Sequence, residues 1–160
     1  MLLKPFYDPR KSYQENFKKG PFGAFANKIS YNKISDRPEK VYNFLGFKVN
    51  SPFGIPAGPL INGKFVEAAL KKGFDIVTYK TVRSVKHSCH SWPNVLSVKV
   101  DGDLTLEKAK NKIIANHEYN KPLSITNSFG VPSFDPEFWR KDMIQVLKNM
   151  RPGQILIGAF

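Results

Sequence analysis

Lys80 is the residue of this chain whose type and position most strongly indicate chemistry. It follows residues 73–79, a short run that begins at a glycine and is rich in β-branched and aromatic side chains. Such a run predicts a strand that is buried on both faces. A lysine at the carboxyl end of a buried strand costs free energy unless an anion or several acceptors meet its ammonium group. In parallel α/β folds, that end of the sheet is where active sites are built.

Two other segments carry residues that suit a binding site. Residues 56–58 (Pro-Ala-Gly) end an apolar strand predicted over residues 53–59, and residues 127–131 (Asn-Ser-Phe-Gly-Val) lie in an extended segment that turns at Gly130. If the sheet is parallel, these loops converge with Lys80 and its neighbour at one face. Glycine backbone, one ammonium group and an amide side chain then suit a planar, electron-poor or anionic heterocycle.

Each of these residues also has a purely structural interpretation. Lys80 could extend its ammonium group along the strand end into solvent. Gly58 could serve only a tight turn, although small residues there would also let a flat ligand approach the backbone. Asn127 could be a turn-forming asparagine. The residues alone leave these alternatives open.

A helix predicted over residues 62–73 would position Lys80. Asn62 is a suitable N-cap residue, and Gly73 suits the position just past the helix end. Apolar residues recur between them at helical spacing. A strand, this helix and the strand that ends at Lys80 form a β-α-β unit, which requires a parallel sheet.

The remaining pattern predicts further elements around this unit. Residues 1–40 look irregular and form an N-terminal arm, which we expect either to pack on the domain or to make a subunit contact in a homodimer. The other predicted elements are a hairpin over residues 41–49, a strand over 95–100, a short helix over 104–115, a helix that begins after Asp135 and ends near 152, and a buried strand over 155–160. The apolar face of the helix after Asp135 is expected to contain Phe138, Met143, Val146 and Leu147.

Composition narrows the class of protein. The chain has 160 residues, 41% hydrophobic, which is enough for one domain with a core. No apolar run approaches the roughly 20 residues that span a bilayer, and the start lacks the apolar region of a signal peptide. The single cysteine fits a reducing compartment, so we expect a cytoplasmic protein. The net charge of +12 favours anionic ligands, but it is spread along the chain, and we expect no nucleic-acid partner.

Four motifs resemble the dihydroorotate dehydrogenase family in their order along residues 41–160. Residues 50–58 (Asn-Ser-Pro-Phe-Gly-Ile-Pro-Ala-Gly) resemble its first barrel strand, and residues 78–82 (Thr-Tyr-Lys-Thr-Val) resemble its second strand with the flavin-site lysine. Residues 127–132 (Asn-Ser-Phe-Gly-Val-Pro) are similar to Asn-Ser-Met-Gly-Leu-Pro, the substrate loop of the class 1 enzymes. Residues 91–95 (Ser-Trp-Pro-Asn-Val) match the proline-containing approach to the small sheet of the family.

The resemblance implies a fold, a cofactor and a reaction. The fold would be a (β/α)8 TIM barrel, of which this chain covers only about the first strands, with the 41–49 hairpin closing it below. The cofactor would be FMN, and the reaction a hydride transfer from dihydroorotate to the flavin. By the same resemblance, the flavin-binding residues would be Ala57, Gly58, Lys80 and Thr81. The residues that bind the dihydroorotate- or orotate-like substrate would be Lys80, Asn127, Ser128, Phe129, Gly130 and Val131.

The resemblance assigns no catalytic base within this chain. A (β/α)8 barrel needs roughly 250 residues, and the base is expected beyond Phe160, so the chain looks truncated. Cys89 lies between His87 and His90, but it is in the wrong loop for the base of the family and is interpreted as an inert loop cysteine. With His117 the only other histidine, the ligand count argues against a metal site.

Other functions remain open on the sequence. A related flavin dehydrogenase could act on another pyrimidine or imide, with the same lysine and glycine turn. A basic, non-catalytic binding module or fragment would instead use the positive charge alone.

Overall fold

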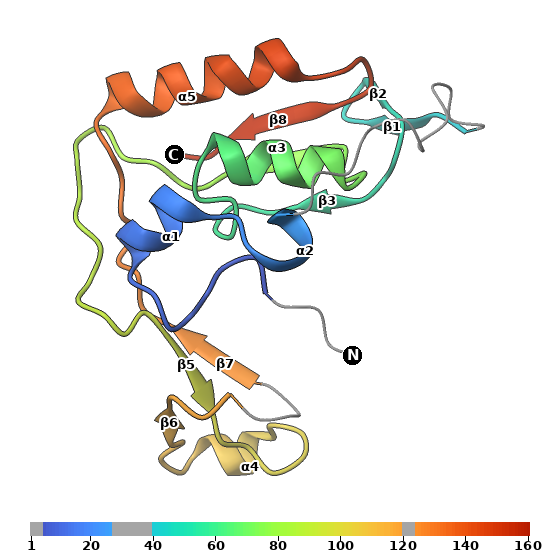
Figure 1. The fold of residues 1–160 in the computed structure, drawn as a ribbon. Helices are drawn as coiled ribbons and strands as arrows, with labels where there is room; N and C mark the ends of the chain where they lie inside the picture. The colour runs from blue at the N-terminus through green and yellow to red at the C-terminus, as the bar shows by residue number, and fades with distance from the viewer. Residues whose placement is uncertain (1–4, 27–39, 120–123) are drawn as a thin grey trace.

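Three short parallel strands run through the middle of the molecule (Figure 1). The computed structural model describes residues 5–26, 40–119 and 124–160. The central strand pairs with one neighbour on each side, with Val77 opposite Ile55 on one side and opposite Leu156 on the other. The strands, in spatial order, are β3 (Gly54–Ile55), β4 (Ile76–Tyr79) and β8 (Ile155–Gly158).

The predicted β-α-β unit is confirmed. Helix α3 (Gly63–Lys71) connects β3 to β4, which are parallel. Asn62 caps the helix, because its side-chain oxygen accepts a hydrogen bond from the Phe65 amide at 3.3 Å. Gly73 follows the helix with a φ of 88°, a conformation that favours glycine. Six of the nine helix residues are buried, so α3 forms the centre of the core.

Helix α5 (Pro136–Asn149) packs against α3 and leads into β8. The face predicted for it is wrong in part, because Leu147 is 54% exposed and Phe138 42% exposed. The buried residues are Val146, as predicted, and Trp139, which the sequence did not place on this face. The helical spacing from 139 to 146 explains the difference, since those positions share one face and Phe138 and Leu147 lie one residue to either side.

Strand β8 is only half-buried, although the sequence predicted a buried strand. Ile155, Leu156 and Ile157 keep partial exposure, and Gly158 is exposed. The reason is that β8 pairs with β4 alone among the described strands, so one side of it has no strand beside it.

The N-terminal arm is not irregular throughout, which corrects the prediction for residues 1–40. It contains α1 (Tyr13–Lys19) and α2 (Gly23–Ala26), whereas residues 1–4 and 27–39 of the predicted arm lie outside the described residues. Helix α1 begins with a capping box, in which Ser12 and Glu15 each bond the backbone amide of the other. The pattern Ser-x-x-Glu at 12–15 was the signal for this helix.

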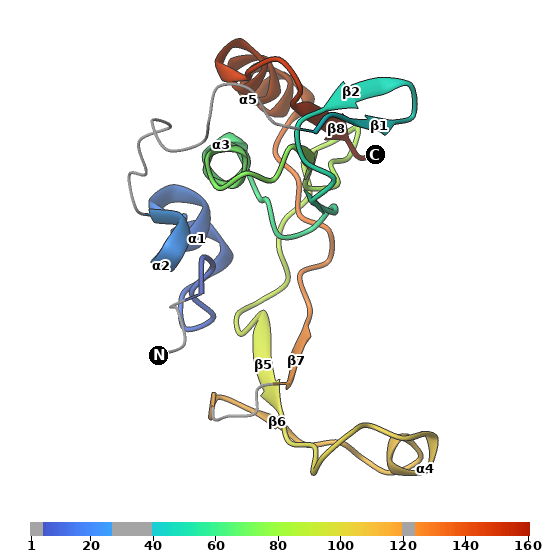
Figure 2. The same cartoon turned by 90° about the vertical axis from the view of Figure 1, so that its right-hand side faces the viewer.

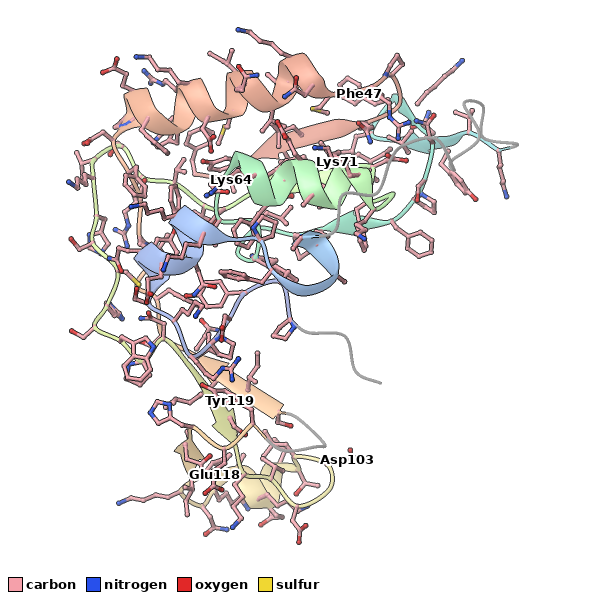
Figure 3. All side chains as sticks on the ribbon, viewed as in Figure 1. Phe47, Lys64, Lys71, Asp103, Glu118 and Tyr119 are labelled. Carbon is pink, nitrogen blue, oxygen red and sulfur yellow. The ribbon has the colours of Figure 1, made fainter. Side chains whose placement is uncertain are left out.

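Two hydrogen bonds fasten the arm to α3. The Asn62 side-chain nitrogen donates to the Phe17 carbonyl at 2.8 Å, and Lys64 Nζ donates to the Lys18 carbonyl at 2.6 Å. Figure 3 shows Lys64 and Lys71 on α3, with Lys64 on the part of the helix nearer to α1. Aromatic side chains of the arm also pack on the core, so the described part of the arm belongs to the body of the molecule.

A second, antiparallel sheet projects away from this body (Figures 1 and 2). Its strands, in spatial order, are β6 (Ala115–Asn116), β5 (Val95–Val98) and β7 (Ser124–Asn127). The helix predicted over residues 104–115 is much shorter, since α4 is only Leu106–Ala109 and the chain then turns into β6. Strand β7 is part of the extended segment predicted before the turn at Gly130, and residues 120–123 in front of it lie outside the described residues.

The predicted hairpin is confirmed as β1 (Tyr42–Phe44) and β2 (Phe47–Val49). Asn50, just after β2, bonds the carbonyls of Pro152 and Gly153, so the hairpin lies beside the segment that enters β8. The described residues form a mixed structure of helices and strands, and their strands do not close into a barrel. Within the same residues, no helix has the length and apolar character needed to cross a membrane.

Candidate functional site

A cavity of about 660 Å³ is lined by residues of the arm, of the parallel sheet with its loops and of the antiparallel sheet. This volume is in the range of small-molecule sites. All three segments predicted from the sequence contribute to its wall. The predicted site residues that line it are Ala57, Gly58, Lys80, Thr81, Asn127, Phe129, Gly130 and Val131.

Ser128 is the predicted site residue that does not line the cavity. Its hydroxyl lies 2.9 Å from His90 Nδ1, and its amide and carbonyl pair with Asn94. Ser128 therefore connects the loop to the segment that contains His90 and Asn94.

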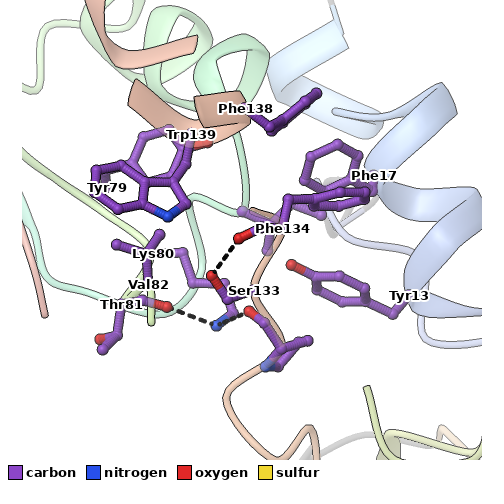
Figure 4. Close-up of a pocket in the computed structure, with 12 residues that line it drawn as sticks. Tyr13, Phe17, Tyr79, Lys80, Thr81, Val82, Ser133, Phe134, Phe138 and Trp139 are labelled. Carbon is purple, nitrogen blue, oxygen red and sulfur yellow. Dashed lines mark hydrogen bonds between the residues drawn. The ribbon is translucent and has the colours of Figure 1, made fainter. Parts of the chain in front are cut away.

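Lys80 directly follows β4 and borders the cavity with only 7% of its surface exposed. Its ammonium group donates to the carbonyls of Thr81 and Pro132, each at 3.1 Å. Figure 4 shows Lys80 beside Thr81 and Ser133. Burial lowers the pKa of Lys80 to about 8, the Cys89 thiol opposes this shift, and the Arg83 charge adds to it. An ammonium group has three donors, and two of them are bonded within residues 5–26, 40–119 and 124–160, so among these residues one remains for a ligand.

A second, much smaller space of about 10 Å³ also borders Lys80, between β4, α5 and the arm (Figure 4). Tyr13, Ser133 and Trp139 are among the residues around it. Its volume suits about one water molecule. The Thr81 and Pro132 carbonyls, together with this space for a water molecule, explain how a buried lysine is tolerated at this strand end.

The backbone conformation at position 58 favours glycine. Gly58 has a φ of 126°, which residues with a side chain rarely adopt. A Cβ built at Gly58 would meet no atom within 4 Å, so the space beside it is open. Both interpretations of this residue are therefore compatible, because a turn that needs glycine also leaves a clear approach to the backbone.

The loop over residues 128–133 has an unusual backbone. Gly130 and Val131 have φ values of 72° and 49°, and a positive φ is strained for a β-branched residue. A Cβ at Gly130 would collide with the His90 ring. His87 pairs with Ser133 through backbone hydrogen bonds of 2.8 and 2.9 Å. The segment from 83 to 94 thus holds this loop along most of its length.

The arm supplies a wall that sequence reasoning did not predict. Tyr7 and Tyr13 line the cavity and meet the Phe129 ring edge-on, with ring centroids 5.6 and 6.0 Å apart. Burial raises the pKa of both tyrosines, so their hydroxyls stay neutral. The remaining arm residues on this wall are Pro5, Phe6 and Pro9. The capping-box pattern could have located α1, but nothing in the sequence places it over Lys80.

Cys89 is half-buried behind the loop and does not line the cavity. Burial raises the pKa of its thiol, and the Lys80 charge opposes that effect. The described residues contain no group of three His, Cys, Asp or Glu side chains placed to hold a metal ion.

Comparison with known proteins gives one relative to report. The chain is 39% identical to a dihydroorotate dehydrogenase of Dictyostelium discoideum over 162 aligned positions. The match covers 98% of this chain but 44% of that protein, so the chain spans less than half the length of its relative. No family model matches the chain, and no solved structure gives a significant match. The resemblance that its motifs indicated is thus confirmed, and the chain is a homologue of part of a dihydroorotate dehydrogenase.

Proposed function

We propose that this chain forms the flavin- and pyrimidine-binding part of an enzyme that oxidises dihydroorotate to orotate in pyrimidine biosynthesis. The observation that carries the proposal is the cavity, which gathers the three family motifs around the buried Lys80. The named relative supports the same reaction class. The parallel strands β3, β4 and β8, with α3 and α5 between them, agree with the first part of a (β/α)8 barrel.

The size of the cavity and the chemistry of its wall support FMN as the ligand. The open space beside Gly58 lets a flat ring approach the backbone, and apolar and aromatic side chains make up most of the wall. Ala57, Gly58, Lys80 and Thr81 would hold the ring. Bound FMN would supply a hydride acceptor for C6 of dihydroorotate.

The loop over residues 127–131 would hold the pyrimidine. Asn127 can pair with the amide edge of the ring through its side chain, and Phe129, Gly130 and Val131 offer backbone groups. The charged form of Lys80 would bind the substrate carboxylate through the donor that the described residues leave free. The proposed substrate is therefore an anionic pyrimidine. No residue of the cavity wall is assigned as the base.

Binding experiments on the purified chain test this proposal. We expect FMN fluorescence to be quenched on binding, and Lys80→Ala to weaken binding of FMN or orotate by about 10- to 100-fold, as loss of a charged hydrogen bond does. Lys108→Ala is the matched control, because Lys108 Nζ also donates to two carbonyls, those of Asp101 and Asp103, but on the exposed α4. A chain that binds no FMN would contradict the proposal.

Dihydroorotate added without oxygen should bleach the flavin absorbance in a catalytically competent assembly. Orotate and uracil separate the two dehydrogenase hypotheses, since only orotate carries a carboxylate. Preference for orotate supports the proposed substrate, whereas equal affinity for uracil would favour a related dehydrogenase acting on another pyrimidine.

A further inference from the structure

Arg83 makes an unusual set of contacts with the loop that lines the cavity. Its Nε donates to the Val131 carbonyl at 3.0 Å, and its Nη2 donates to the Gly130 carbonyl at 3.2 Å. Both acceptor carbonyls belong to residues of this loop that have a positive φ. One guanidinium group therefore holds both carbonyls of the strained turn.

The main chain of Arg83 is itself fixed at both ends. Its amide donates to Ser133 Oγ at 3.0 Å, and its carbonyl accepts a hydrogen bond from Trp139 Nε1 at 3.3 Å. Trp139 is buried in the core, with 6% of its surface exposed. The guanidinium group thus extends from an anchored backbone, although the side chain lies at the surface.

The contacts determine where the amide groups of the turn point. In a trans peptide, the carbonyl of one residue and the N–H of the next point in opposite directions. The Phe129 carbonyl accepts from the His90 amide, and the Gly130 carbonyl accepts from Arg83. The N–H groups of Gly130 and Val131 therefore point away from the 83–90 segment. Neither donates to an acceptor within the described part of the chain.

We propose that Arg83 is a positioning residue, which holds the Gly130–Val131 turn so that its two N–H groups face a bound ligand. The ligand side of this inference rests on the proposed function, and the acceptors would be oxygen atoms of the pyrimidine. The planar fork of arginine donates to two adjacent carbonyls from two nitrogen atoms in a fixed geometry, whereas lysine donates from one freely rotating nitrogen. Arg83 touches neither substrate nor flavin in this role.

Orotate titration of the FMN-loaded chain tests the role of Arg83. We expect Arg83→Ala to weaken orotate binding by about tenfold or more, with Arg83→Lys intermediate, while FMN affinity changes by less than about twofold. Lys86→Ala is the control, because it removes one exposed positive charge from the same segment. Guanidinium ion added at low concentration should restore orotate binding to Arg83→Ala and leave the wild-type chain unaffected.

Three outcomes would overturn the inference. They are unchanged orotate affinity in Arg83→Ala, an equal effect of Lys86→Ala, and parallel loss of FMN and orotate binding without rescue by guanidinium. If the Ala variant does not fold, Arg83→Lys provides the same test, since wild-type orotate affinity in it would show that the fork is not needed.

A measurement without ligand separates this inference from the proposed function. If the wild-type chain binds no orotate, the proposed function fails, but the turn can still be examined by NMR. A strong NOE between the amide and α protons of Val131 reports its positive φ, which brings these two protons closer than a negative φ does, and Arg83→Ala should weaken that NOE. An unchanged NOE in the variant would overturn the positioning role.

Discussion

The two sheets of this molecule are built in opposite ways. The parallel region consists of β3, β4 and β8 with helices α3 and α5, and α3 alone has six buried residues. The antiparallel region consists of β5, β6 and β7 with α4. In that region all four residues of β7 are exposed and α4 has no buried residue. One region has a core, and the other is held mainly by backbone hydrogen bonds.

This difference indicates how the candidate site is stabilised. The parallel region supplies Lys80 and the Gly58 turn from well-packed elements, whereas the antiparallel region supplies Val95, Ile125 and Asn127 to the cavity wall. Groups on packed elements keep their positions more firmly than groups on exposed ones. We therefore expect substitutions in the parallel region to change stability and those in the antiparallel region to change it little.

The largest expected effect comes from Phe65 in α3, which is fully buried beside Phe6 and Gly20. Phe65→Ala should lower the free energy of unfolding by about 3–5 kcal/mol, because it leaves a cavity in the core. Leu106→Ala on α4 should change it by about 0.5 kcal/mol or less, since Leu106 is 86% exposed. Urea unfolding of both variants measures this, and similar losses would show that the two regions do not differ.

The next effect concerns Asp142, which joins three elements of the parallel region. Its Oδ2 accepts hydrogen bonds of 2.6 Å from the Tyr79 hydroxyl and from the Gly63 amide at the start of α3. Asp142→Asn should cost about 1.5–3 kcal/mol, because it weakens two charge-assisted bonds at a helix N-terminus. Glu137→Gln, on the exposed first turn of α5, the helix that carries Asp142, should leave the melting temperature unchanged. Equal melting temperatures for all three proteins would contradict this assignment.

The charge of Lys80 should make ligand binding depend on pH. Its pKa is about 8, so the ammonium form predominates below that value and is lost above it. Orotate affinity should accordingly fall by up to about tenfold per pH unit above pH 8, because the bound anion favours the protonated lysine. Lys80→Met should remove this dependence, whereas Lys108→Met should retain it. A wild-type profile that is flat from pH 7 to about pH 10 would rule out this role of the charge.

The smallest effect compares two N-caps of the same kind. Asn62 accepts a hydrogen bond from the Phe65 amide, and Thr105 accepts one from the Lys108 amide. Asn62→Ala should cost about 1 kcal/mol of global stability, as the loss of a cap does in a helix that the core requires. Thr105→Ala should only fray α4 locally. Amide hydrogen exchange distinguishes the two results, and a global effect of Thr105→Ala would show that the antiparallel region is part of the same cooperative unit.

Local signals were sufficient to predict the parts of the fold that depend on neighbouring residues. Asn62 and Gly73 marked the ends of α3, and the glycine at 46 marked the hairpin. The convergence of the Gly58 and Lys80 segments followed from the parallel arrangement. The Asn127 segment belongs to the antiparallel sheet instead, so only the family motifs indicated that it lies beside them. Their roles in binding stay predictions.

The features that could not be predicted depend on distant contacts. Arg83 looks like any exposed arginine in the sequence, and its bonds to residues 130 and 131 exist only because the two segments lie side by side. Trp139 and Phe138 are adjacent, so only the rotation of α5 against α3 decides which of them is buried. The arm wall over the cavity is likewise a result of packing.

The double role of Asn62 has a kinetic consequence. Its oxygen caps α3 while its nitrogen donates to the Phe17 carbonyl near the end of α1. Lifting the arm from the cavity would therefore break this bond, leave a carbonyl of α1 unpaired and release the side chain that caps α3. Because the Lys64–Lys18 bond and the aromatic packing of the arm would be lost in the same event, ligand exchange past the arm should be accompanied by deuterium uptake in the first turn of α3.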